Sequence, residues 1–88
     1  MGIENTETGE VLQVSVYPNP ATYAFQVDIP HKLIGGRFAI TNSMGQLLQQ
    51  GVLDAPSTIF DINNYAQGVY FISIYSSFGE KSIRFVKN

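Results

Sequence analysis

The chain has 88 residues, a net charge of −2 and no cysteine, and 44% of its residues are hydrophobic. This length allows one domain, in which roughly 60–65% of the surface of the extended chain is buried on folding. The near-neutral charge excludes a basic footprint for nucleic acid, and no apolar run approaches the ~20 residues of a membrane-spanning helix. We therefore expect one small globule with no nucleic-acid partner and no direct membrane insertion.

The first residues of the chain differ in composition from the rest. They are polar and acidic, and their apolar residues show no periodicity. A segment of this kind cannot bury enough apolar surface to order itself. We interpret residues 1–11 as a flexible linker and residues 12–88 as the domain.

From Leu12 onwards, short runs alternate apolar and polar residues and are rich in β-branched and aromatic side chains. Alternation with a period of two predicts strands that bury one face. The predicted strands span residues 12–17, 23–29, 36–42, 46–53, 57–62, 69–76 and 81–87. Because no segment shows a helical period, we predict an all-β fold: a seven-stranded antiparallel β-sandwich, immunoglobulin-like but without its disulfide.

Two motifs between the predicted strands carry specific turn chemistry. Tyr17 and Asn19 each precede a proline and are therefore restricted to extended backbone, so Tyr17-Pro18-Asn19-Pro20 predicts a corner between the first two strands. Asn42-Ser43-Met44-Gly45 has asparagine at the first position of a turn and glycine where a positive φ is tolerated. It therefore predicts a hairpin.

Alternation also assigns side chains to the core or to the surface. The residues expected to point inward are Val14, Val16, Phe25, Val27, Ile29, Phe38, Ile40, Leu48, Phe60, Ile62, Tyr70, Ile72, Ile74, Ile83 and Phe85. The large apolar residues expected outside are Tyr17, Leu47, Phe71, Tyr75, Phe78 and Val86. This is more exposed apolar surface than a small inert sandwich requires, and it indicates a partner surface.

Three motifs and the end of the chain together resemble a known family. The motifs are Tyr17-Pro18-Asn19-Pro20 with Phe25 and Val27, residues 42–48, residues 65–70 with Ile72 and Ile74, and the basic, apolar ending at residues 81–87. In this order they resemble the type A C-terminal sorting domain of the type IX (Por) secretion system of Bacteroidetes, over about residues 12–88. Asn42 stands where the family usually has aspartate, and Tyr65 where it usually has leucine. Asparagine accepts the same turn hydrogen bond, and tyrosine fills an apolar corner position if its hydroxyl finds a partner.

The resemblance implies a folded export signal at the C-terminus of a larger cargo protein. Such a cargo reaches the periplasm by an ordinary signal peptide and crosses the outer membrane because proteins of the type IX translocon recognise the domain. The cargo is then secreted or held at the cell surface, and a sortase-like cell-surface protease removes the domain. The partners implied are the translocon, this protease and the N-terminal cargo domain of the parent chain.

The residues that we expect to take part in recognition lie in the motifs and in the last strand. They are Tyr17, Pro18, Asn19, Pro20, Gly45, Gly68, Tyr70, Lys81, Arg84, Val86 and Lys87. The glycines and the corner also have purely structural explanations in positive φ and restricted torsions. We expect the last strand to be a sheet edge that presents Lys81, Arg84 and Lys87 and is open to a partner strand or to a second copy, although lysines also protect edges.

Two other functions remain open at this point. Exposed Tyr17, Phe71 and Tyr75 could form the stacking platform of a carbohydrate-binding module, and a passive spacer domain is a third possibility. Catalysis and metal binding have no support, because the single His31 has no visible partner ligands and Asp61-Ile62-Asn63-Asn64 lacks the other ligands of a calcium loop. We expect no enzymatic activity and no cofactor.

Overall fold

A computed structural model describes residues 13–88, so Leu12 and the predicted linker lie outside the described residues. The described strands are β2 (Ser15–Tyr17), β3 (Ala24–Asp28), β4 (Arg37–Asn42), β5 (Leu47–Val52), β6 (Ser57–Asp61), β7 (Gly68–Ser76) and β8 (Gly79–Lys87). Each corresponds to one predicted strand. The 3₁₀ helix η1 (His31–Leu33) was not predicted, because a single turn is too short to show a period.

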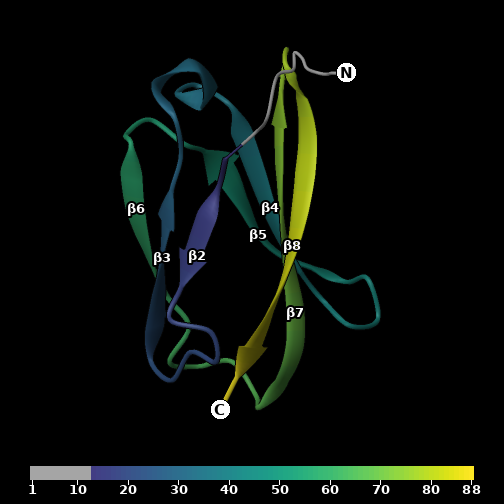
Figure 1. Ribbon diagram of the computed structural model, residues 1–88. Coiled ribbons are helices and arrows are strands. Elements are labelled where there is room, and N and C mark those ends of the chain that lie inside the picture. The colour runs from purple at the N-terminus through teal and green to yellow at the C-terminus, as the bar shows by residue number, and fades with distance from the viewer. Residues whose placement is uncertain (1–12) are drawn as a thin grey trace, which may run out of the picture.

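The strands form two antiparallel sheets that face each other. The three-stranded sheet has the order β2-β3-β6, and the four-stranded sheet has the order β5-β4-β7-β8. Figure 1 shows the two layers, with β2 and β8 at the edges nearest the viewer. The predicted all-β sandwich of seven strands is therefore confirmed, and without cysteine it has no disulfide. Within residues 13–88 no helix is long or apolar enough to span a membrane.

Aromatic rings join the two sheets across the core. Phe25 of the three-stranded sheet lies between Phe60 of the same sheet and Phe85 of the other, with ring centroids 5.2 and 4.4 Å away. The row continues from Phe60 to Phe38 at 4.8 Å and from Phe85 to Tyr70 at 5.6 Å. Aromatic pairs of this kind stabilise a fold by about 0.5–1.5 kcal/mol beyond the burial of their area.

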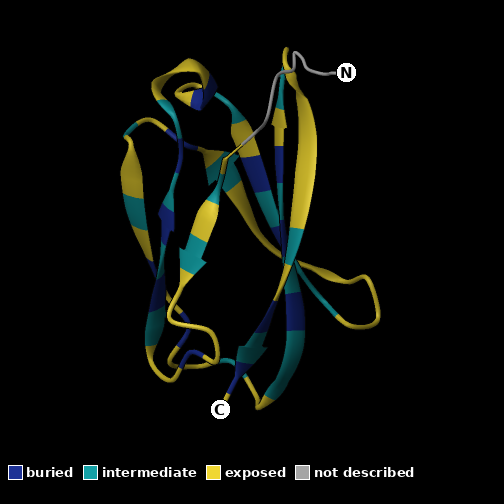
Figure 2. Cartoon of the chain, in the orientation of Figure 1, coloured by how far each residue is buried: buried dark blue, intermediate teal, exposed yellow. Residues whose placement is uncertain are grey.

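The alternation of buried and exposed positions follows the expected pattern along most strands (Figure 2). The residues predicted to point inward are buried, with three half-buried against the core, Val14, Val16 and Ile83, and with one exception, Leu48. Leu48 is 43% exposed. Its inward placement was wrong because a bulge in β5 adds a residue: Gln49 pairs with Ile40 while Leu47 pairs with Thr41.

The bulge changes which residues of β5 face the core. Gly51 lies opposite Phe38, and a Cβ atom added to Gly51 would come within 2.9 Å of the Phe38 ring. Beyond the strand, Leu53 is fully buried, as are Leu33 of η1 and Ala21 of the corner. These three core residues were not predicted. The inner face of β5 itself contributes little bulk to the core.

The predicted hairpin turn between β4 and β5 is confirmed. The Asn42 side-chain oxygen accepts hydrogen bonds from the backbone N–H groups of Met44 and Gln46 at 2.9 and 3.0 Å. Gly45 follows with a φ of 83°, a conformation that residues with a Cβ rarely adopt. In Figure 1 this turn projects beyond the body of the sandwich.

The chain enters and leaves the sandwich at opposite ends. β2 begins on the side of η1, because Ser15 pairs with Asp28 shortly before that helix. β8 ends on the other side, where Lys87 pairs with Gly68 and forms a bridge to Ala21. Figure 1 shows the two positions near the top and the bottom of the molecule.

Candidate recognition site

The corner after β2 is formed by residues 17–21. The Tyr17-Pro18 and Asn19-Pro20 peptide bonds are both cis. The side chains of residues 17–20 are exposed, whereas Ala21 is completely buried in the core. The predicted corner is confirmed, and Ala21 anchors it to the rest of the fold.

The corner packs along the outer edge of the end of β8. The Ala21 N–H donates to the Val86 carbonyl at 2.7 Å, and the Asn88 N–H donates to the Ala21 carbonyl at 2.8 Å. Ala21 and Lys87 thereby form a parallel bridge. The first family motif therefore lies directly against the last residues of the chain.

Asn19 extends this contact through its side chain. Its amide oxygen accepts the Val86 N–H at 3.0 Å, and its amide nitrogen donates to the Arg84 carbonyl at 3.2 Å. Sequence analysis missed this contact, because a side-chain amide that bonds a strand 65 residues away leaves no periodic signal. We call residues 17–21 together with residues 84–88 the corner–strand site.

Lys87 corrects one expectation about the last strand. It was expected to project into solvent, but only 9% of its surface is exposed. Alternation places Lys87 on the same face as Phe85, towards the core, and its ammonium group donates to the Asn88 carbonyl at 2.9 Å. Its neighbour on β7 is Gly68, which has a φ of 152°.

Tyr70 and Tyr65 stabilise the turn that precedes β7. Tyr70 is only 6% exposed, and its hydroxyl donates to the Ala66 carbonyl at 2.6 Å, so the side chain ties the strand to its own connection. The Tyr65 ring lies beside it, tilted by 34° with the ring centroids 5.1 Å apart, and its hydroxyl donates to the Gln49 side-chain oxygen at 3.2 Å. Burial, and secondly the neighbouring Tyr70, raise the pKa of Tyr65. The expected condition for tyrosine at this position, a partner for its hydroxyl, is therefore met.

The structure gathers most of the predicted recognition residues at one end of the sandwich and leaves two apart. Those at the corner end are Tyr17, Pro18, Asn19, Pro20, Gly68, Tyr70, Arg84, Val86 and Lys87. Gly45 lies in the β4–β5 turn, which starts at the same end because Asn42 pairs with Tyr70 but projects away from the body of the sandwich. Lys81, which pairs with Ile74, lies in the half of β8 near the β7–β8 turn. Arg84 is exposed and Val86 half-buried on the outer face of β8, so both present side chains at the corner–strand site.

Tyr17 is held by a polar row on the outer face of the three-stranded sheet. Its hydroxyl donates to the Asp28 carboxylate at 2.5 Å, and the Gln26 amide donates to both groups, at 2.7 and 2.8 Å. Ser57 also donates to Asp28 at 2.7 Å. These hydrogen bonds, from Gln26 first and then from Tyr17 and Ser57, lower the pKa of Asp28, and the bond to Asp28 is the main cause that raises the pKa of Tyr17.

The family can be identified at this point. A family model described as the secretion system C-terminal sorting domain matches residues 15–88. The chain belongs to this family. Among solved structures, it is similar to PorZ, an essential bacterial surface component of the type IX secretion system of Porphyromonas gingivalis, with 26% sequence identity and a TM-score of 0.75. The match covers 85% of this chain but only 11% of that protein. No curated protein is significantly similar in sequence.

The family assigns the function in general terms. This sorting domain is a C-terminal signal of the type IX secretion system, as the resemblance implied. It directs a parent chain across the outer membrane, towards the cell surface or beyond. Membership indicates a role that is not enzymatic.

The sorting domain does not assemble the stacking platform that a carbohydrate-binding module would need. Tyr17 lies on the outer face of the three-stranded sheet, beside Gln26. Phe71 and Tyr75 lie on the outer face of the four-stranded sheet, beside Thr41 and Arg37. The three rings that the alternative required are thus on opposite sides of the molecule.

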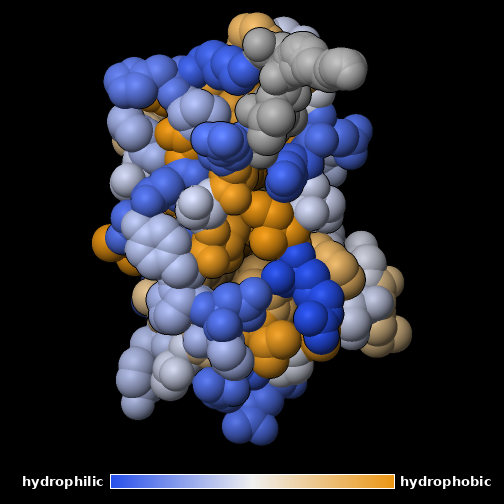
Figure 3. Space-filling view, in the orientation of Figure 1, coloured by the Kyte–Doolittle hydropathy of each residue, from blue (hydrophilic) through white to orange (hydrophobic). Residues whose placement is uncertain are grey.

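Apolar side chains gather along the side of the sorting domain between β2 and β8, as Figure 3 shows. Val14, Val16 and Ile83 are half-buried and pack against the core. The two sheets are therefore not fully closed on this side. The open seam lies next to the corner–strand site along β8.

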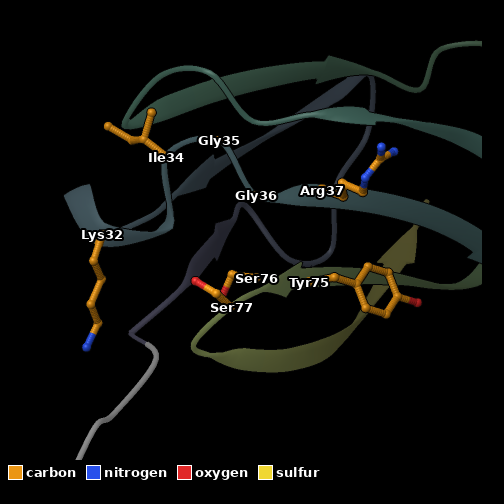
Figure 4. A pocket seen from close by; sticks show the side chains of 8 residues that line it. All are labelled: Lys32, Ile34, Gly35, Gly36, Arg37, Tyr75, Ser76 and Ser77. Carbon is orange, nitrogen blue, oxygen red and sulfur yellow. The ribbon is translucent and has the colours of Figure 1, made fainter.

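A hollow lies at the other end of the sorting domain, between η1 and the end of β7. It has a volume of about 430 Å³ and is lined by Lys32, Ile34, Gly35, Gly36, Arg37, Tyr75, Ser76 and Ser77. Figure 4 shows Lys32 and Arg37 on opposite sides of this hollow. Lys32 also lies over the Phe78 ring, 5.5 Å from its centroid. Within residues 13–88, no three histidine or acidic side chains cluster as metal ligands would, and Asp61 instead accepts the Asn63 N–H at 2.9 Å in its own turn.

Proposed function

We propose that the type IX translocon recognises this sorting domain at the corner–strand site, and that the domain acts as an address without chemistry of its own. The observation that carries the proposal is the contact between the Tyr17-Pro18-Asn19-Pro20 motif and residues 84–88. Two segments at opposite ends of the domain sequence meet on one surface. Exposed Arg84 and the exposed corner offer a partner a basic and an apolar contact side by side.

The proposal predicts secretion of a reporter. Residues 3–88 fused behind a periplasmic reporter, in a bacterium that has the type IX system, carry the reporter out of the cell. Removal of residues 84–88 abolishes its appearance in the medium or on the cell surface, as measured by immunoblot and by protease accessibility. Retention of the intact fusion in the periplasm contradicts the function.

A charge reversal at Arg84 tests whether the corner–strand site itself is needed for secretion. Arg84→Glu is expected to lower secretion about tenfold, because a directly contacted charged group contributes roughly 1.5–3 kcal/mol to binding. Arg37→Glu is the matched control, since Arg37 is also exposed on the outer face of the same sheet but lies near the opposite end. Equal loss from both variants contradicts recognition at the corner–strand site, while the intact fusion still tests the function itself.

We further infer that the cargo passes through the periplasm, and that a sortase-like protease then cuts the parent chain before β2. The polar, acidic composition of residues 3–11 supports this, because segments of such composition ahead of a folded domain are preferred sites of proteolytic cleavage. Mass spectrometry of the exported reporter is expected to show a new C-terminus before residue 13. An exported reporter that retains the whole sorting domain contradicts the cleavage step alone.

A further inference from the structure

β8 is an edge strand, so alternate residues direct their backbone N–H and C=O groups away from β7. The register with β7 is unbroken from Gly68–Lys87 to Ser76–Gly79. Because both backbone groups of Val86 bond the corner, the outward-facing residues are the even-numbered ones, from Glu80 to Asn88. An exposed row of such groups is a template on which another strand can form.

The corner occupies the second half of this row. The Asn19 amide takes the place of a backbone peptide unit, with its oxygen on the Val86 N–H and its nitrogen on the Arg84 carbonyl. Ala21 continues with two backbone hydrogen bonds, to Val86 and from Asn88. Four hydrogen bonds therefore close the edge from the Arg84 carbonyl to the Asn88 N–H.

The corner closes this edge without creating a new one. Pro18 and Pro20 have no N–H group, so the segment cannot itself act as a regular strand for a further partner. Ala21 is completely buried, which fixes the corner to the core. In the first half of β8, Glu80 and Ser82 make no comparable contact with any residue among residues 13–88.

We propose that Asn19 is a positioning residue that locks the edge from the Arg84 carbonyl to Asn88, so that neither a partner strand nor a second copy can pair there. A partner then contacts this part of β8 through its side chains and the corner, and any strand pairing with β8 is confined to the backbone from Glu80 to the Arg84 N–H. That this partner is the translocon rests on the proposed function. The closure of the β8 edge by Asn19 does not depend on the proposed function.

Amide hydrogen exchange measured by NMR tests the lock in the unmodified chain. Val86 and Ser82 both face outward on the same strand, so without the lock both amides exchange fast. With the lock, Val86 exchanges at least about tenfold more slowly than Ser82 after correction for intrinsic rates, as one added hydrogen bond predicts. Equal rates for the two amides overturn the proposal.

Variants of Asn19 test which group forms the lock. Asn19→Ala removes both side-chain bonds, and Val86 exchange is expected to accelerate about tenfold while Phe85, which faces β7, stays slow. Asn19→Asp keeps the oxygen that accepts the Val86 N–H, so Val86 stays protected. Thr22→Ala, a change at an exposed neighbour of the corner, leaves all rates unchanged. Unchanged Val86 exchange in Asn19→Ala, or equal acceleration of Val86 and Phe85, overturns the role of Asn19.

The oligomeric state gives a second measurement. The unmodified chain is expected to sediment as a monomer at submillimolar concentration, or to self-associate with added exchange protection confined to Glu80, Ser82 and Arg84. Self-association that shifts the NMR signals of the Asn19 side-chain amide and the Val86 N–H contradicts the lock, because a strand then displaces the corner. None of these measurements involves secretion, so a failure of the lock is distinguishable from a failure of the proposed function.

Discussion

β5 and β8 are both edge strands of the four-stranded sheet, but among the contacts of residues 13–88 only those of β8 cover part of an outer edge. β5 is exposed over nearly its whole length, and its inner face is interrupted by Gly51. β8 buries Phe85 completely, and its end is bonded to the corner. The comparison indicates that β8 completes the core of the domain, whereas β5 is attached to one side of it.

The largest expected effect is on the β8 side of this comparison. Phe85→Ala removes a buried ring that contacts Phe25 and Tyr70, so the free energy of unfolding is expected to fall by about 3–5 kcal/mol. This is a large part of the roughly 4–13 kcal/mol of a domain of this length. Leu48→Ala on exposed β5 is expected to change it by less than about 0.5 kcal/mol. Urea unfolding of both variants measures the difference, and similar losses would remove the distinction between the two edges.

The second largest effect on stability is expected at Gly51, where β5 contacts the core. Gly51→Ala forces a methyl group against the Phe38 ring, which cannot retreat because it packs on Phe60 at 4.8 Å. We expect a loss of about 1–3 kcal/mol in the free energy of unfolding. Gln50→Ala on the exposed face is the control, with a change below about 0.5 kcal/mol. Thermal unfolding that is identical for the two variants contradicts this packing.

A smaller effect on stability is expected from proline substitutions in the two halves of β8. Proline is tolerated where a strand's N–H faces away from its neighbour, so Ser82→Pro is expected to fold. Val86→Pro places the same ring at an equivalent outward position but loses the bond to Asn19, and it is expected to be less stable by a further ~1 kcal/mol. Chemical unfolding measures both variants. Equal stability of the two variants would show that the hydrogen bond between Asn19 and Val86 adds nothing to the free energy of unfolding.

The smallest effect is on the pH dependence that comes from the hydrogen-bonded pair Tyr17 and Asp28. The pKa of Asp28 is lowered in the folded state, so its stabilising contribution is present above the ordinary aspartate pKa and is lost as the pH falls through the folded value. The pKa of Tyr17 is raised, so its contribution is present below the ordinary tyrosine pKa and is lost as the pH rises through the folded value. Asp28→Asn is therefore expected to flatten both flanks of the curve of melting temperature against pH. The exposed Asp54→Asn serves as control, and flanks unchanged in Asp28→Asn would contradict the coupling.

Much of the fold could be predicted because alternation records which face of a strand is buried. It located all seven described strands, and turn chemistry located the Asn42–Gly45 hairpin turn. It failed at Leu48 because one added residue reverses the phase, and at Leu33 because a single 3₁₀ turn has no period. Both failures concern local geometry that the pattern of residue types does not encode.

The candidate site was predicted only in part, for a different reason. The motifs identified the corner and the last strand, but no pattern indicated that Asn19 bonds Val86. The bond depends on how the two sheets are placed, and a polar side chain can reach any strand edge nearby. For Lys87, charge and alternation pointed in opposite directions, and alternation decided the outcome because the carbonyl of Asn88 lies within reach of the ammonium group.

The opposite placement of the first and last described strand ends has a mechanical consequence. β2 begins near η1, while the corner–strand site lies at the far end (Figure 1). If the translocon binds at the corner–strand site as proposed, the contacted surface is at the end of the sandwich opposite to the point where the described chain begins. Recognition at that surface would then make little demand on the size or shape of the cargo.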